Sequence, residues 1–318
     1  VVAATTQVDF ANTNGVTNWK LGAFSGTTGH PSCVSFFEQR LVFAGTIAEP
    51  QTLYFSKAGD YENMTTGTNA DDAMVYTIAS NQVNRIRYLK SVRTLIVGTT
   101  GGEFTVSADG TDAAVTPTNI VIKKQSSYGT ANVDAQPAGS SILFLQKAKR
   151  KIRELTYNFD VDGYVAADLT IFYDIVTKSG INEMTYQQEP DSILWCVRDD
   201  GVFAGLTYQR SENVVAWHRH KLGGTFGAGT SATGYGVVES VASISGELTE
   251  DELYVIVKRT INGATKRYVE VFAPFDFDET TSTDFRFLDS HLTYSGGSTT
   301  TLSGLSHLEG QVVSILAD

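Results

Sequence analysis

Short β-strand patterns recur along this chain at intervals of about 45 to 50 residues, and this recurrence constrains the fold more than any other feature. Each interval holds three or four runs rich in β-branched and aromatic residues, separated by Gly, Asn and Asp. Five such intervals follow one another between residues 33 and 273. Because units of this length are typical of propeller blades, the sequence predicts an all-β chain, a β-propeller of about five to six blades. A β-sandwich is the alternative.

Within each unit, a continuously apolar strand precedes a strand of mixed character. In the second unit, Leu-Ile-Val at 95–97 is followed by Gly-Glu-Phe-Thr-Val at 102–106. We expect the apolar strand to be buried on both faces between neighbouring blades and the strand after it to be half exposed. Asn262-Gly263 supplies the positive φ that a tight type I′ hairpin requires.

Composition excludes several classes of protein. The chain has 318 residues, 42% hydrophobic and 19% charged, which argues against a disordered segment or a coiled coil. A chain of this length buries enough surface to fold without disulfides, so Cys33 and Cys196 are expected inside strands as small apolar residues, with a structural bridge as the alternative. No run approaches the roughly 20 apolar residues of a membrane span.

The pattern divides the chain into three parts. Residues 33–278 form the expected propeller, and residues 1–32 an N-terminal segment that could close its ring through the strand pattern at 8–10. Residues 279–318 read as the start of a further β domain or a truncated tail, with strand patterns at 287–294, 301–305 and 312–316. The missing initiator Met and the abrupt end lead us to expect a segment of a longer polypeptide.

The motifs of this sequence lead us to expect no catalytic, metal or cofactor site. His218 and His220 are two apart and would leave the same face of a strand, but a metal site needs at least a third ligand. The Asp160-Val-Asp-Gly163 run lacks the full calcium-loop pattern and favours a hairpin turn. Residues 107–111 resemble an Asp-box turn without its Trp. No Gly-x-Ser-x-Gly nucleophile turn is present.

Positive charge is concentrated at one place in an acidic chain. With 24 Lys and Arg against 35 Asp and Glu, the net charge is −11, which argues against an outer surface that wraps nucleic acid but suits the wall of a pore through which DNA slides. The basic residues of the cluster are Lys147, Lys149, Arg150, Lys151 and Arg153. We interpret them as a hairpin tip and a candidate interface; a solvated loop, an acidic neighbour and DNA all remain open.

Four further side chains have expected structural roles. Trp195 and Trp217 fall in adjacent strands of the fourth unit and should fill the space between blades, with a sugar-stacking platform as the alternative. Arg40 and Arg198 are expected to pair with acidic groups and tie loops together.

A set of short sequence segments, here called words, closely resembles a family of phage and prophage structural proteins, the tail nozzle or tail tubular protein B of short-tailed phages. The words are WKLGAFSGTTGHP at 19–31, FFEQRLVFAGT at 36–46, PQTLYFS at 50–56, GDY at 59–61, NRIR at 84–87, VGTTGGEF at 97–104, LWCVRDDG at 194–201, LTY at 206–208, AWHRH at 216–220 and LSHLEG at 305–310. Each word is weak alone, and the combination spans nearly the whole chain.

The resemblance implies a structural, non-enzymatic component of a virion tail. It implies a propeller domain within a larger nozzle subunit, six copies of which would form the distal tube below the adaptor ring, near the portal. The family's partners are the tail adaptor, tail fibres and the DNA that passes through the lumen without specific binding. The alternative function, from a different class, is a carbohydrate-active or carbohydrate-binding propeller acting on host surface glycans, which two carboxylates in an aromatic-walled cleft would favour.

Overall fold

The computed structural model describes residues 22–80, 83–110, 113–246 and 250–273, together with residues 294, 296–306, 313 and 315. Over this part of the chain, strands β1 to β19 form five antiparallel sheets in strict chain order. Helix is confined there to three single 3-10 turns, η1 (Phe159–Val161), η2 (Arg210–Glu212) and η3 (Gly229–Ser231). The expectation of an all-β chain is confirmed.

Each sheet is a meander in which every strand pairs with its neighbours in sequence. The first sheet contains β1 (Cys33–Phe37), β2 (Arg40–Ala44), β3 (Thr52–Phe55) and β4 (Met74–Thr77). The second contains β5 (Ile86–Ser91), β6 (Leu95–Thr99), β7 (Gly102–Ala108) and β8 (Ile120–Ser126). The third contains β9 (Gln136–Ala138), β10 (Ser141–Leu145), β11 (Ile152–Asn158) and β12 (Gly163–Asp168). The fourth contains β13 (Ile181–Gln187), β14 (Ile193–Arg198), β15 (Phe203–Gln209) and β16 (Val214–His220). The fifth contains β17 (Val237–Ile244), β18 (Glu252–Ile261) and β19 (Ala264–Phe272).

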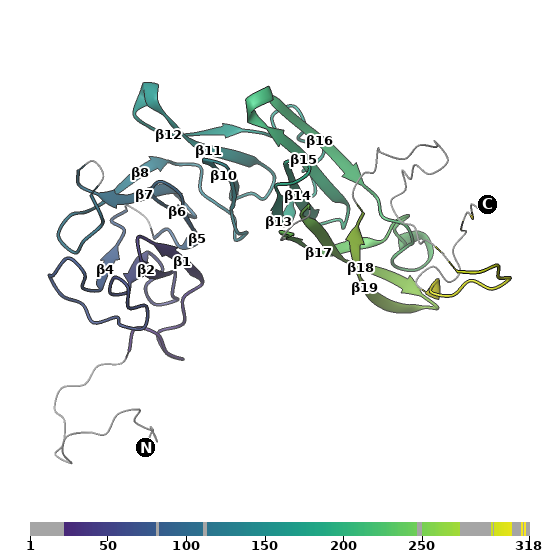
Figure 1. Ribbon diagram of the computed structural model, residues 1–318, viewed down its shortest axis with the longest axis horizontal. Helices are drawn as coiled ribbons and strands as arrows, with labels where there is room; N and C mark the ends of the chain where they lie inside the picture. Colours follow the sequence, from purple (N-terminus) through teal and green to yellow (C-terminus); the bar gives the residue numbers. More distant parts are fainter. Residues whose placement is uncertain are drawn as a thin grey trace, which may run out of the picture.

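The sheets follow one another along an open arc, from β1–β4 at one end to β17–β19 at the other (Figure 1). First strands of successive sheets touch, β1 with β5, β9 with β13 and β13 with β17. Successive four-stranded meanders packed in this way are propeller-type blades. The five units predicted between residues 33 and 273 are therefore confirmed.

Four apolar cores lie between the five sheets. The first joins sheets one and two around Phe55 and Phe104, and the second joins sheets two and three around Phe144. The third joins sheets three and four around Leu206, and the fourth joins sheets four and five around Trp195. Because a central sheet touches a neighbour on each face, its second strand is buried along its length, as predicted: every residue of β6 and β10 is buried.

The two terminal sheets expose some apolar side chains on the face turned away from the neighbouring sheet. In β18 buried and more exposed residues alternate, since only one face packs on the fourth sheet. Ile256, Val269 and Val271 are exposed on the other face. At the opposite end of the arc, Val34 and Phe36 are exposed on the first sheet, whereas Phe24 covers Phe43 and Tyr54 on the same face.

Three features of the sequence prediction need correction. The third strands are not half exposed: the first five residues of β7 and the first four of β11 and β15 are buried, because both of their faces are covered. Strands β1, β8 and β9 were not predicted, and β9 is a three-residue strand containing Pro137. The tail strand expected at 301–305 is absent from those described residues. The patterns at 8–10 and 287–293 lie outside the described residues, as does most of 312–316.

Turn chemistry follows the sequence closely. Asn262 and Gly263 have φ of 50° and 72°, as a type I′ hairpin requires. In the turn between β11 and β12, the Asn158 side chain accepts from the amide of Asp160, and Asp162 adopts the left-handed conformation. The run at 160–163 is therefore a hairpin turn, as expected.

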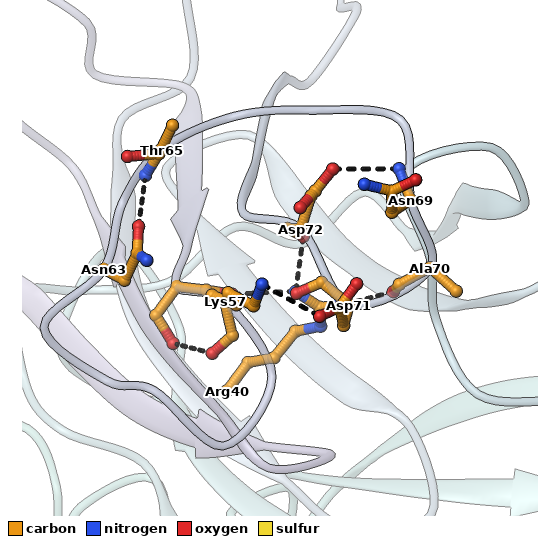
Figure 2. A network of polar contacts seen from close by, with 9 residues as sticks. Arg40, Lys57, Asn63, Thr65, Asn69, Ala70, Asp71 and Asp72 are labelled. Carbon is orange, nitrogen blue, oxygen red and sulfur yellow. Dashed lines mark hydrogen bonds and ion pairs between the residues drawn. The ribbon is translucent and has the colours of Figure 1, made fainter.

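Arg40 fastens the long β3–β4 loop from inside (Figure 2). Its guanidinium is buried and donates to the carbonyls of Ser56 at 2.8 Å, Ala70 at 2.6 Å and Asp72 at 2.7 Å. The same loop is closed by the Lys57–Asp71 ion pair at 2.9 Å. Arg40 thus ties a loop as predicted, but through backbone carbonyls rather than acidic side chains.

Arg198 pairs with an acid as predicted, since its guanidinium lies 2.5 Å from the Asp200 carboxylate.

Trp195 stacks on Phe203 with 4.9 Å between ring centroids and fills the core between sheets four and five. Trp217 packs against the core between sheets three and four. Both tryptophans therefore have the inter-blade role expected of them.

Candidate interaction site on the third sheet

The predicted basic cluster lies at the β10–β11 hairpin, and the structure divides it between two roles. Lys151 forms an ion pair with Asp168 at 2.7 Å. Lys149 adopts the left-handed conformation and its Nζ donates to Asn182 Oδ1 at 2.8 Å, which links the hairpin to the fourth sheet. Lys147 and Arg150 are exposed.

Arg153 does not belong to the exposed surface. Its guanidinium is buried, lies 3.4 Å from the ring centroid of Tyr128, and donates to the Ala166 carbonyl at 2.8 Å. It also lies near the buried Glu103, whose pKa is raised by burial and lowered in part by this positive charge. Arg153 therefore joins the second and third sheets, and the predicted interface loses one of its five members.

Beside the basic hairpin, the β12–β13 loop presents a run of apolar side chains to solvent. The exposed fractions are 65% for Ile171, 87% for Phe172, 40% for Tyr173 and 67% for Ile175. Exposed large apolar residues grouped in this way usually mark a contact surface. The sequence pattern alone did not identify this surface, because the same six residues, Ile-Phe-Tyr-Asp-Ile-Val at 171–176, could equally have formed a buried segment.

The loop is held in place at both ends, so its apolar side chains do not simply reflect a loose segment. Leu169 and Val176 are buried in the core between sheets three and four. The Thr177 hydroxyl donates to the Arg150 carbonyl at 2.6 Å, which fixes the loop against the basic hairpin. The two elements therefore form one surface, which we call the apolar–basic tip. It comprises Ile171, Phe172, Tyr173, Ile175, Lys147, Lys149, Arg150 and Lys178.

The histidine pair is packed among aromatic rings. His218 Nδ1 and His220 Nε2 are 2.8 Å apart, and both rings lie near Trp195. Burial and the neighbouring His220 lower the pKa of His218 to about 4, so the ring is neutral near pH 7. Over the described residues, no group of three or more His, Cys, Asp or Glu side chains is arranged to hold a metal ion.

Other candidate features are structural. Cys33 and Cys196 are buried free thiols, and burial raises the pKa of each. Two hollows in the described surface have volumes of about 580 and 310 Å³. The larger is lined by residues such as Thr77, Ser80 and Asn84 and by no carboxylate; the smaller has one, Asp134. No described helix is long and apolar enough to span a bilayer.

No family model matches the chain, and no curated protein matches it in sequence. Among solved structures, it is similar to the Swd1 (Cps50) β-propeller domain of Myceliophteria thermophila, with 8% identity, a TM-score of 0.42, and 75% of this chain and 69% of that one covered. It is also similar to the Neurospora crassa Pan2 WD40 domain, with 12% identity, a TM-score of 0.41, and coverage of 78% and 63%.

A third similar structure is an auxiliary nutrient binding protein from Bacteroides thetaiotaomicron, with 11% identity and a TM-score of 0.37. The match covers 77% of this chain, which spans 57% of that protein's length. At these identities no function is transferred. The class of protein is defined by the five sheets themselves: an all-β chain of propeller-type blades with an apolar–basic tip on its third blade.

Proposed function

We propose that this chain is a non-enzymatic structural domain of a phage tail, a propeller-type part of a nozzle subunit located in the virion. The observation that supports the proposal most directly is the position of the family-like words in the structure. Residues 36–46 cover the end of β1, the β1–β2 turn and β2. Residues 97–104 span the β6–β7 turn, and residues 194–201 cover most of β14 and the turn after it. The resemblance therefore falls on the framework of blades one, two and four.

The exposed apolar side chains on the outer faces of the first and fifth sheets also support a role inside a larger assembly. Isolated domains rarely leave such sheet faces uncovered. Closure by the N-terminal segment, as expected from the sequence, or by another part of the complete subunit would bury them. The six-copy ring, the adaptor and the tail fibres belong to this proposal as the partners of the complete subunit.

Passage of DNA without specific binding agrees with the charges on the first strands of the sheets. Lys90 on β5 pairs with Asp134 at 2.6 Å, and Arg87 donates to Asn132 at 3.1 Å. Glu239 on β17 accepts from Arg267 at 2.5 Å. Within the part of the chain that the structure describes, the charges of Lys90 and Glu239 are compensated and that of Arg87 is not, so few uncompensated cations face phosphates along these first strands.

The carbohydrate-active alternative has no specific observation in its favour. Glycoside hydrolysis uses two carboxyl groups about 5 to 10 Å apart, and neither described hollow has two. Trp195 and Trp217 pack between blades and do not form a sugar platform.

Immunogold electron microscopy of virions with an antibody against this chain tests the proposal. We expect label at the distal tail. Absence of label from intact and detergent-opened virions, or release of reducing sugar from host polysaccharide by the purified chain, would overturn it.

A further inference from the structure

The third blade has a second exposed apolar tip at its opposite end. In the β11–β12 turn, Phe159 is 87% exposed and Val161 is 63% exposed. Asp160 and Asp162 lie between and beside them. We call Phe159, Asp160, Val161 and Asp162 the apolar–acidic tip.

The two tips are separated by the length of one strand ladder. Arg153 pairs with Asp168 at the end near the basic hairpin, and Asn158 pairs with Gly163 at the end near the acidic turn. Since a strand rises about 3.3 Å per residue, the tips are roughly 20 Å apart and face in opposite directions. One copy of the chain can therefore use both tips at once.

The charges of the two tips are opposite. The first tip has more positive than negative side chains. Its four cations are Lys147, Lys149, Arg150 and Lys178, and the two acids near it are Asp174 and Asp199. The β11–β12 turn itself carries the two negative charges of Asp160 and Asp162, and Arg93, whose guanidinium lies 5.8 Å from the Tyr157 ring centroid, and Lys123 on the neighbouring β8 lie behind it. The Lys151–Asp168 and Arg210–Glu154 pairs are compensated within the chain.

We propose that the apolar–basic tip of one copy docks on the apolar–acidic tip of the next copy, in a head-to-tail contact through the third blade. Two chains of net charge −11 repel each other, so a second copy must approach through a surface of the opposite sign. The basic tip provides that surface, and each tip offers apolar side chains that the other can cover. This inference rests on the proposed function, because that function requires several copies of the chain to assemble.

A contact of this kind is heterologous, because it uses two different surfaces. Repetition gives a ring if the rotation between copies closes and a filament if it does not. A pair of loop tips buries less surface than a standard interface, so the isolated contact should be weak, with a dissociation constant of about 10 to 100 μM. Closure of a ring would strengthen it through the high effective concentration of the last contact.

Sedimentation velocity of the purified chain from about 1 to 200 μM, at low and at 0.5 M salt, tests the contact. We expect concentration-dependent self-association that weakens with salt. Lys147→Glu with Arg150→Glu makes both tips acidic, and Asp160→Lys with Asp162→Lys makes both basic. Each double variant alone should associate at least about tenfold more weakly than the parent chain.

Mixing the two double variants is the decisive measurement. In the mixture every acidic tip meets a basic tip on a chain of the other variant, so association should return to the strength seen for the parent chain, although each variant alone associates only weakly. Arg219→Glu with Lys266→Glu, on exposed positions of β16 and β19 in the fourth and fifth sheets, is the matched charge control and should not respond to mixing. Phe172→Ser should weaken association, whereas Ile47→Ser, which changes an apolar residue 74% exposed on another blade, should not.

Three results would overturn the inference: a parent chain that stays monomeric at 200 μM, double variants that associate like the parent chain, or a mixture that does not recover. If the Phe172 and Lys147/Arg150 variants lose binding to vesicles of anionic phospholipid while self-association is unchanged, the tip binds a membrane surface and the inference fails. Virion labelling tests the proposed function independently of this contact. If tails are labelled but the tip variants associate like the parent chain, the proposed function holds and the contact does not. If association recovers on mixing but virions are not labelled, the contact holds and the proposed function does not.

Discussion

Glu154 and Arg210 form an inter-sheet pair whose two members differ greatly in exposure, and this asymmetry gives a sharp prediction. The Glu154 side chain is 3% exposed, whereas that of Arg210 is 44% exposed. Glu154 also accepts from the Tyr208 hydroxyl at 2.8 Å and from Arg210 Nε at 3.0 Å. We compare Arg210→Met, Glu154→Gln and the variant that carries both changes.

The more exposed partner should be the more costly one to remove. Arg210→Met leaves a buried carboxylate without its positive partner, which costs about 3 to 5 kcal/mol in buried pairs, and here about 3 because Tyr208 still donates. Glu154→Gln keeps an acceptor for Tyr208 and leaves Arg210 free to turn toward water, so the cost should be about 1.5 kcal/mol. Adding Glu154→Gln to Arg210→Met removes the stranded charge and should recover about 1 to 2 kcal/mol.

Urea unfolding followed by tryptophan fluorescence measures these differences. In a Trp19→Phe background the remaining tryptophans, Trp195 and Trp217, both lie in the fourth sheet, which η2 and Arg210 belong to. Lys123→Met is the control for loss of an exposed positive charge. A larger loss for Glu154→Gln than for Arg210→Met, or a double variant less stable than Arg210→Met, would refute the reasoning.

Three further predictions concern packing, thiol reactivity and pH. Gly98→Ala should destabilise the chain by about 1 to 3 kcal/mol in thermal unfolding, because the added Cβ would overlap the buried Tyr88 ring. Gly139→Ala is the control: the space around Gly139 is open, so this change should cost only the strain of the positive φ, about 1 kcal/mol. Cys196, which is fully buried, should react with a thiol reagent such as DTNB at the rate of unfolding, and its rapid labelling in the native chain would contradict this burial. The pKa of His218 is lowered to about 4 from 6.5, so the unfolded chain takes up a proton that the folded chain refuses, and stability should fall as pH is lowered from about 6.5 to 4. Because the ring is only partly buried, we expect a loss of about 1 to 2 kcal/mol, absent in His218→Gln and measurable by urea titrations at pH 7 and 4.5.

The sequence determined the number and order of the described blades because strand and turn signals are local. Alternation, β-branched runs and the Asn262-Gly263 turn depend only on neighbouring residues, and the five units and their hairpins appear where these signals stand. Burial of the continuously apolar strands β6 and β10 also followed from sequence, since such a strand needs cover on both faces.

Tertiary structure alone decided what covers each side chain. Glu103 and Glu154 occupy mixed strands and read as half exposed, yet both are buried, because neighbouring sheets bring Arg153 and Arg210 to them from distant positions in the chain. The same packing removed Arg153 from the predicted interface and placed the apolar residues at 171–175 beside Lys147 and Arg150. These contacts join residues far apart in sequence, and no local pattern records which sheet faces which.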